Sequence, residues 1–253
     1  MSSDPQSAIS ASVPALAFEG VSKRFGNSVA LQELSLQVAQ GESFGLAGMN
    51  GAGKTTLIKC LLDFCASDAG RIEIFGVSNR LTVSRSRLAF LPERFQPPYY
   101  LTGCDFLRYM LKLQGVPYHE AEAEDMLQGL DLDLSALTKP VRAFSKGMTQ
   151  KLGLAACFLS RKELYILDEP TSGLDPKARA LLKRRLRALR DQGRTIFFTS
   201  HSLADVEEIC HRMAVIHNGR LRFAGAPAQL RGESGADTLE EAFLARIDAV
   251  EAH

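Results

Sequence analysis

Residues 48–55 constrain this chain more than any other stretch of its sequence. They read Gly-Met-Asn-Gly-Ala-Gly-Lys-Thr and match G-x-x-x-x-G-K-[ST], a loop that wraps phosphate groups. A short, mostly apolar run at 43–47 precedes the loop, and a helical pattern at 56–62 follows it. Glycines let successive backbone N–H groups turn toward an anion, and a helix N-terminus adds partial positive charge. The pattern therefore predicts a strand, a phosphate-binding loop and a helix.

Two side chains of this loop suit the phosphates of a nucleotide. Lys54 is expected to reach the β- and γ-phosphates, and the Thr55 hydroxyl is expected to hold Mg²⁺. The alternative is a glycine-rich turn that serves only the fold. Such a turn has no need of a lysine and a hydroxyl at these offsets, so we prefer nucleotide binding.

Composition narrows the class of protein. The chain has 253 residues, 45% of them hydrophobic, which suits one large α/β domain or two small ones. The 30 Lys and Arg nearly cancel the 29 Asp and Glu, so no overall charge favours nucleic acid or an anionic membrane surface. The five cysteines form no C-x-x-C pair, which argues against a zinc site or a disulfide framework and favours a reduced, cytoplasmic compartment. No apolar run approaches the roughly 18 residues that cross a bilayer.

Strand patterns flank the loop and recur later in the chain. Residues 16–46 and 71–75 are expected to form an antiparallel sheet that leads into the loop. Buried strands are expected at 88–91, 164–167 and 195–198, alternating with helices, as in a mostly parallel sheet covered on both faces. A hairpin with a type I′ turn is expected where Asn-Gly separates the last two strand patterns, 213–216 and 220–223.

The stretch 101–160 has helical patterns only, and we expect an inserted subdomain there. Thr102 and Asp105 predict a capping box for a helix that ends near Gln114. A second helix is expected at 119–130, and Ser145 is expected to cap a third that ends near residue 160. Residues 1–14, rich in Ser, Ala and Pro, are expected to be a flexible tail and not a signal peptide.

Two adjacent carboxylates, Asp168 and Glu169, directly follow the apolar run at 164–167. They are thus expected at the C-terminal edge of a buried strand, where α/β sheets bind ligands. One acid can hold Mg²⁺ through water, and the next can orient the attacking water. Downstream of a phosphate-binding loop, this pair predicts nucleotide hydrolysis.

Taken in order, these motifs resemble the ATP-binding subunits of ABC transporters from about residue 16 to residue 223. The matching positions are Phe25 for the aromatic that stacks on adenine, 48–55 for the Walker A loop, Glu93 for the Q-loop, 144–148 for the signature motif, Asp168 and Glu169 for the Walker B acids, 172–175 for the D-loop and His201 for the switch histidine. The signature motif distinguishes this family from other NTPases, because many of those also carry the Walker A and Walker B motifs. The resemblance implies an α/β fold with a P-loop NTPase core and mostly parallel sheet, an N-terminal antiparallel β subdomain and an inserted helical subdomain.

The resemblance also assigns domains and site residues. It implies an ATPase domain at 15–235, with the helical subdomain inserted at about 95–160, and a C-terminal helical tail at 236–253. The cofactors implied are ATP and Mg²⁺. The nucleotide-binding positions are Phe25, Gly48, Asn50, Gly51, Ala52, Gly53, Lys54, Thr55, Thr56, Glu93, Ser145, Gly147 and Asp168. Glu169, His201 and Lys54 would be catalytic, and Thr55, Asp168 and Glu93 would face the metal.

Partners follow from the same resemblance. Ser145 and Gly147 would clasp the γ-phosphate held by another protomer, which implies a homodimer or heterodimer of ATPase subunits. A separate membrane-spanning permease would hold the protein at the inner face of the cell membrane, and no nucleic acid is expected. An apolar cluster around Tyr99 and Tyr100 is expected to receive a short helix of that permease, with local packing as the alternative.

Three positions depart from the family pattern. Glu93 stands where glutamine is usual, and Gln96 is near enough to leave the assignment open. Lys146 replaces the first glycine of the signature and Met148 its glutamine, whereas the serine and Gly147 remain. We expect Ser145 and Gly147 still to bind the γ-phosphate despite these changes. Sequences with short variants of this kind resemble exporter-type subunits.

Other interpretations compete with these. The protein could be an ATP-dependent machine acting on nucleic acid or ribosomes, but such relatives usually carry a long coiled-coil insertion or tandem ATPase halves. A nucleotide-binding regulator that does not hydrolyse ATP is disfavoured by Glu169. His201 could merely start a helix, and Phe25 could be a core residue. The basic cluster within 183–190 is interpreted as the solvated face of an amphipathic helix, with anionic lipid contact as the alternative.

Overall fold

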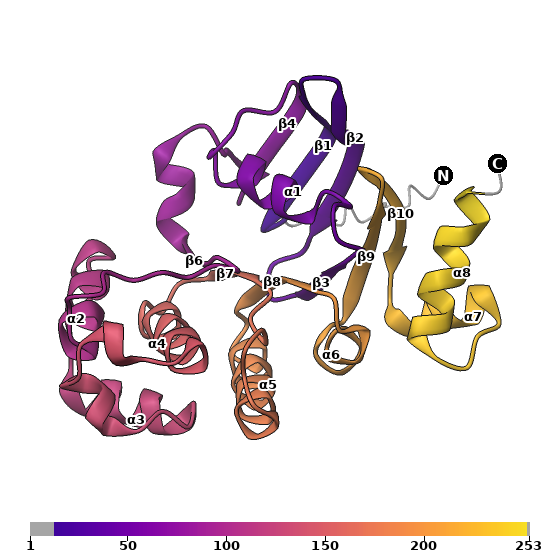
Figure 1. Ribbon diagram of the computed structural model, residues 1–253. Helices are drawn as coiled ribbons and strands as arrows, with labels where there is room; N and C mark the ends of the chain where they lie inside the picture. The colour runs from indigo at the N-terminus through magenta and orange to yellow at the C-terminus, as the bar shows by residue number, and fades with distance from the viewer. Residues whose placement is uncertain (1–12, 252–253) are drawn as a thin grey trace, which may run out of the picture.

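The computed structural model describes residues 13–251, so the tail expected at 1–14 lies almost wholly outside the described part. Two sheets organise the chain (Figure 1). The four-stranded sheet has the order β2-β1-β4-β5 and is antiparallel, with strands β1 (Leu16–Phe25), β2 (Ser28–Val38), β4 (Ala69–Ile74) and β5 (Val77–Ser78). The antiparallel subdomain expected from the sequence is thus present.

The six-stranded sheet has the order β10-β9-β3-β8-β7-β6 and positions the functional site. Its strands are β3 (Ser43–Ala47), β6 (Leu88–Leu91), β7 (Leu164–Asp168), β8 (Thr195–Ser200), β9 (Arg212–His217) and β10 (Arg220–Gly225). All neighbours pair in parallel except β9 and β10, which form the expected hairpin. At its turn Asn218 and Gly219 have φ of 49° and 72°, as a type I′ turn requires.

One strand lies in a different sheet from the one the sequence suggested. Residues 16–46 were expected to form a single antiparallel sheet, but β3 at 43–47 pairs in parallel with β8 and β9. All five of its residues are buried. A strand buried on both faces fits the centre of a covered parallel sheet, whereas β2 alternates between buried and exposed positions and fits a sheet with one open face.

Two apolar clusters cover the faces of the parallel sheet. On one face, α1 (Lys54–Leu61) and the antiparallel sheet pack around aromatic residues, including Phe44 and Phe197, whose stacked rings lie 6.0 Å apart. On the other face lie α4 (Lys146–Leu159), α5 (Pro176–Asp191) and α6 (Leu203–Ile209) (Figure 1). The sheet is therefore enclosed, and its carboxyl edge is left to bind ligands.

The inserted helical region has the three helices that the sequence predicted. They are α2 (Gly103–Leu113), α3 (Glu120–Gly129) and α4. The capping box at α2 is confirmed, because the Thr102 side chain accepts from the Asp105 amide and the Asp105 side chain accepts from the Thr102 amide. Ser145 caps α4, accepting a hydrogen bond from the Met148 amide at 3.2 Å.

The basic side of α5 is less solvated than the sequence suggested. Lys183 bonds both Asp205 and Glu208 of α6, at 2.7 and 2.6 Å, and Arg187 also pairs with Glu208. Leu182 and its apolar neighbours on the opposite side of α5 are buried, as expected. Part of the basic cluster therefore fixes α6 against α5 instead of facing only water.

Two further helices end the described chain, α7 (Pro227–Ser234) and α8 (Leu239–Glu251), and Figure 1 shows them packed beside β10. The buried residues Leu239, Ala242 and Ile247 anchor α8. Within residues 13–251, no helix combines the length and the apolar character needed to span a membrane.

Candidate active site

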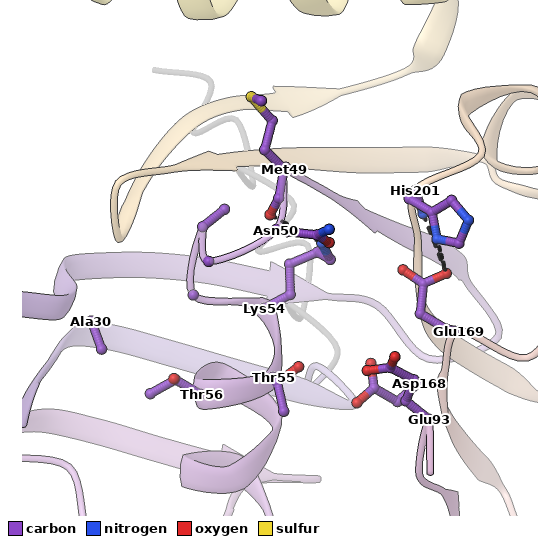
Figure 2. Close-up of a pocket in the computed structure, with 13 residues that line it drawn as sticks. Ala30, Met49, Asn50, Lys54, Thr55, Thr56, Glu93, Asp168, Glu169 and His201 are labelled. Carbon is purple, nitrogen blue, oxygen red and sulfur yellow. Dashed lines mark hydrogen bonds and ion pairs between the residues drawn. The ribbon is translucent and has the colours of Figure 1, made fainter. Parts of the chain in front are cut away.

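The side chains predicted to carry chemistry meet at the carboxyl ends of β3, β6, β7 and β8. They surround a cavity of about 520 Å³ (Figure 2). Its lining comprises Ala30, Met49, Asn50, Gly51, Ala52, Gly53, Lys54, Thr55, Thr56, Glu93, Asp168, Glu169 and His201. Segments as far apart in sequence as residues 30 and 201 thus contribute to one site, because parallel strands end at the same edge of the sheet.

The loop between β3 and α1 has the backbone expected of an anion nest. Gly51 and Gly53 have φ of 80° and 114°, a region that favours glycine. Gly53 also passes so close to β2 that a Cβ there would lie 2.6 Å from the Ala30 carbonyl oxygen. The N-terminus of α1 follows directly, so its unpaired N–H groups are available to phosphate oxygens.

Lys54 is folded back onto this loop. Its ammonium donates to the carbonyl oxygens of Gly48 at 2.6 Å and Met49 at 3.3 Å. Burial lowers the pKa of Lys54, and the carboxylates across the pocket oppose that shift. The amine therefore lies beside the phosphate-binding loop, held by carbonyl oxygens that an anionic phosphate can outcompete.

Asp168 and Glu169 are joined by a residue of the next strand. The Thr199 hydroxyl donates to Asp168 Oδ1 at 2.6 Å and accepts from the Glu169 amide at 3.0 Å. Burial raises the pKa of the Asp168 carboxyl, and the nearby Glu93 adds to the rise, whereas the Thr199 hydrogen bond opposes it. Parallel pairing of Asp168 with Thr199 places the hydroxyl beside both acids.

Glu169 and His201 contact each other across the end of the sheet. Glu169 Oε2 lies 2.7 Å from His201 Nδ1 and accepts from the His201 amide at 3.3 Å (Figure 2). Glu169 has φ of 51°, a strained conformation for a residue with a side chain. Its carboxylate is buried, while 69% of the histidine side chain is exposed. The carboxylate is therefore held in place, and the imidazole faces the open side of the pocket.

The structure separates the two candidates for the Q-loop position. Glu93 lines the nucleotide-sized cavity, near Asp168. Gln96 lines a different groove, together with Pro97, Pro98 and Tyr99. Glu93 therefore lies at the pocket and also reaches the groove of Gln96, whereas Gln96 does not line the pocket.

The oxygen ligands at the cavity suit Mg²⁺, but they do not form a complete metal site by themselves. A hydroxyl from Thr55 and carboxylates from Asp168 and Glu93 are the oxygen ligands that this hard cation prefers. The raised pKa of Asp168 marks a carboxylate whose charge is poorly compensated, which a cation would relieve. No cluster of three or more His, Cys, Asp or Glu suited to a metal occurs in the described residues. Such a site suits an ion that is bound jointly with phosphate oxygens.

Four predicted residues lie outside the cavity. Gly48 starts the loop but lines a smaller neighbouring hollow. Phe25 is 51% exposed, with the Lys23 ammonium 5.3 Å from its ring centre. Ser145 is exposed at the start of α4, and Gly147 follows it. Within its own chain, the signature turn thus contributes nothing to the lining of the nucleotide cavity.

The signature turn instead touches the D-loop. A Cβ at Gly147 would lie 2.9 Å from the Gly173 carbonyl oxygen, so this position needs glycine for close approach. Lys146 donates to the Ser172 hydroxyl at 3.3 Å. The lysine that replaces a glycine of the family pattern therefore ties the two motifs together.

Sequence reasoning missed two residues that line the cavity, Met49 and Ala30, and also Thr199, which hydrogen-bonds Asp168 and the Glu169 amide. Thr199 follows an apolar run as Asp168 does, and the shared end of parallel strands could have identified it. Met49 is a variable position inside the loop motif, and Ala30 comes from the antiparallel sheet. Neither Met49 nor Ala30 has a side-chain functional group that a sequence motif could identify.

Comparison with known proteins gives a consistent result. The family profile described as ABC transporter matches residues 31–172. An uncharacterized ABC transporter ATP-binding protein of Synechocystis sp. is 41% identical over 208 residues, which are 80% of this chain but only 58% of that protein. A Nod factor export ATP-binding protein I of Burkholderia thailandensis is 38% identical over 234 residues, covering 90% of this chain and 77% of that protein.

Solved structures agree. One described as the ATP-binding subunit of an ABC transporter has a TM-score of 0.84 and 31% identity, and the match covers 92% of this chain and 99% of that one. A dimeric cassette bound to ADP and Pi, 19% identical, shares the fold with a TM-score of 0.76 over 83% of this chain and 98% of its own. The chain therefore belongs to the ABC transporter family, as an ATP-binding subunit with the P-loop fold of its cassettes.

Proposed function

We propose that this protein hydrolyses ATP as one of two cassettes that close around the nucleotide and drive a separate membrane permease. The observation that carries the proposal is the convergence of the loop at 48–55, the acids Asp168 and Glu169, and His201 on one cavity. Three separate segments supply a phosphate cradle, a pair of carboxylates and an imidazole. Phosphoryl transfer to water needs these groups together.

Each group has a distinct role in this proposal. The amides of the loop and Lys54 bind the β- and γ-phosphates and stabilise the charge that develops on them. Glu169 orients the attacking water, and its strained backbone and contact with His201 keep the carboxylate aimed into the pocket. His201 presents its exposed ring to the γ-phosphate. Thr199 positions both acids by bonding one side chain and the neighbouring amide.

Thr55, Asp168 and Glu93 would hold Mg²⁺ in this scheme. When bound, the ion neutralises charge on the phosphate oxygens. The second carboxylate makes the site more anionic than one with glutamine, so cation binding is expected to be tighter and release slower.

The exposed signature turn supports dimerisation. Ser145 and Gly147 do not line their own nucleotide cavity, yet α4 begins there with Ser145 as its cap. A helix N-terminus is suited to bind an anion. We propose that it meets the γ-phosphate bound by Lys54 of the facing protomer.

A groove of about 880 Å³ beyond β6 supports the permease contact. Its lining combines aromatic and proline side chains with polar ones, from Glu93 to Tyr99 and from Val141 to Gln150. At its rim Tyr99 and Tyr100 are each 67% exposed, with ring centres 5.5 Å apart. Exposed aromatic pairs of this kind favour a protein interface. The name of the Nod factor export relatives supports an export role at the inner face of the membrane.

Release of phosphate by the purified protein tests the ATPase proposal. Hydrolysis is expected to require Mg²⁺ and to disappear in Lys54→Ala. Lys59→Ala is the matched control, because Lys59 is an exposed lysine of the same helix that does not line the cavity. Loss of activity in both variants, or in neither, would contradict the assignment.

Co-purification from native membranes tests the permease contact. Replacing Tyr99 and Tyr100 by Ser is expected to remove a co-purifying membrane polypeptide while leaving the melting temperature unchanged. Tyr109→Ser is the control, since Tyr109 on α2 is also exposed but lies outside the groove. Unfolding of the double variant would show that the two tyrosines serve packing.

A further inference from the structure

A second hollow adjoins the first cavity and shares Met49, Asn50 and His201 with it. It measures about 310 Å³ and is lined by Gly48, Met49, Asn50, Ser200, His201, Leu203 and Phe243. Six of these residues belong to the phosphate loop or to the segment from β8 into α6. The seventh, Phe243, comes from the C-terminal helix α8.

Phe243 is held firmly by its own helix. Ala242 and Ile247 beside it are 0% and 3% exposed, and Phe243 itself is 9% exposed. Arg246 pairs with Glu233 of α7 at 2.5 Å and lies 5.7 Å from the ring centre of Phe223 on β10. The ring of Phe243 is thus a buried wall of the hollow and not an exposed surface side chain.

Opposite this wall, the Met49 side chain has more freedom. Met49 is 54% exposed, and Figure 2 shows it directed away from Lys54 and the two acids. A methionine has several accessible rotamers and no polar anchor. The His201 ring is held on one side by Glu169, while its other neighbours in the hollow are the loop and Phe243. Gly48 lies close against β9, because a Cβ added at Gly48 would lie 2.6 Å from the Ile216 carbonyl oxygen.

We propose that Phe243 is a positioning residue of the nucleotide site. It limits how far the loop tip at Met49 and Asn50, and the His201 ring, can move out of the phosphate-binding arrangement. In this way α8 couples the C-terminal part of the chain to ATP binding. This role deepens the proposed function and rests on it.

The positioning effect of Phe243 is expected to be measurable in the protein without nucleotide. Hydrogen–deuterium exchange followed by mass spectrometry is expected to rise in peptides covering 48–51 and 200–203 when Phe243 becomes Ala. The affinity for ATP is expected to fall about three- to tenfold, through a higher KM with little change in kcat. Phe243→Tyr, which keeps the ring, is expected to retain both properties.

Two control variants separate positioning from loss of packing. Ile247→Ala removes a buried side chain from the same helix but not from the hollow, so it should lower the melting temperature without raising exchange at 48–51. Leu244→Ala changes an exposed neighbour, 53% exposed, and should change neither. Equal exchange at 48–51 in Phe243→Ala and Ile247→Ala, or no rise in Phe243→Ala, would overturn the proposal. A wild-type protein that does not bind ATP would refute the proposed function instead, since the exchange test needs no nucleotide.

Discussion

The two regions of this chain that we propose to bind phosphate are built differently. In the site at the end of the parallel sheet the two acids and Thr199 are buried, and its members are bonded to one another: Asp168 to Thr199, Thr199 to the Glu169 amide, and Glu169 to His201. The signature turn at Ser145 is exposed, and its contacts within the chain include its own cap and the D-loop. One part of the site is therefore already held in place within the chain, and the other part, the signature turn, is exposed at the surface. This is the arrangement expected of a site completed by a second subunit.

The largest expected effect comes from the buried half. Glu169→Gln keeps the size and one hydrogen-bond acceptor but removes the charge that orients water. Turnover is expected to fall about a hundred- to ten-thousand-fold, while ATP binding persists. Phosphate release and nucleotide binding by calorimetry check the two parts. Hydrolysis equal to that of wild type would remove Glu169 from its proposed role.

The exposed half is tested by mixing two inactive variants. Lys54→Ala and Ser145→Arg are each expected to be nearly inactive as homodimers. If Ser145 serves the facing protomer, a mixed dimer carries both lesions in one site and none in the other. Equal mixing is then expected to restore roughly a quarter of wild-type activity, provided that one intact site turns over alone.

Linked protomers check that proviso. A linked dimer with Lys54→Ala in one half and Ser145→Arg in the other should hydrolyse ATP as fast as a linked dimer in which only one site is damaged. Inactivity of the first beside activity of the second would show that Ser145 does not act across the interface. The comparison between the two halves of the site would then be wrong.

Thr199→Val should produce a smaller loss. Valine keeps the shape but removes both hydrogen bonds, so the Glu169 amide is left without its partner. Activity is expected to fall about tenfold, and stability by about 1–3 kcal/mol because a buried amide is unsatisfied. Thr195→Val is the matched control: on the same strand it removes a hydrogen bond to the Gly41 amide, far from the site. It should lower the melting temperature but not the activity, and equal losses of activity in both would assign Thr199 to folding alone.

The smallest effect is expected at Glu93. Glu93→Gln restores the neutral amide usual in the family and removes one carboxylate near Asp168. The Mg²⁺ concentration for half-maximal activity is expected to rise by only about two- to fivefold, because the phosphates and Asp168 remain as ligands. Gln96→Ala should leave that concentration unchanged, since Gln96 lines the other groove. A larger shift in Gln96→Ala than in Glu93→Gln would reverse the assignment.

The sequence was most informative where a structure depends on neighbours in the chain. The loop at 48–55, the capping box at Thr102 and the serine cap at Ser145 were all predictable, because a cap bonds amides two or three residues away. The parallel strands were recognised by their apolar runs. Placing β3 with the antiparallel strands was wrong, because a five-residue run does not reveal which strands will lie beside it.

By itself, the sequence determined the family, the order of its motifs and the chemistry available to them, since each motif is a local pattern of residue types. Only the tertiary structure decided that Thr199 joins the two acids, that Glu93 and not Gln96 lines the cavity at the phosphate loop, and that Phe243 lies opposite the loop. These contacts join residues that are tens to nearly two hundred positions apart. They depend on strand register and on where α8 packs, which no short pattern along the chain encodes.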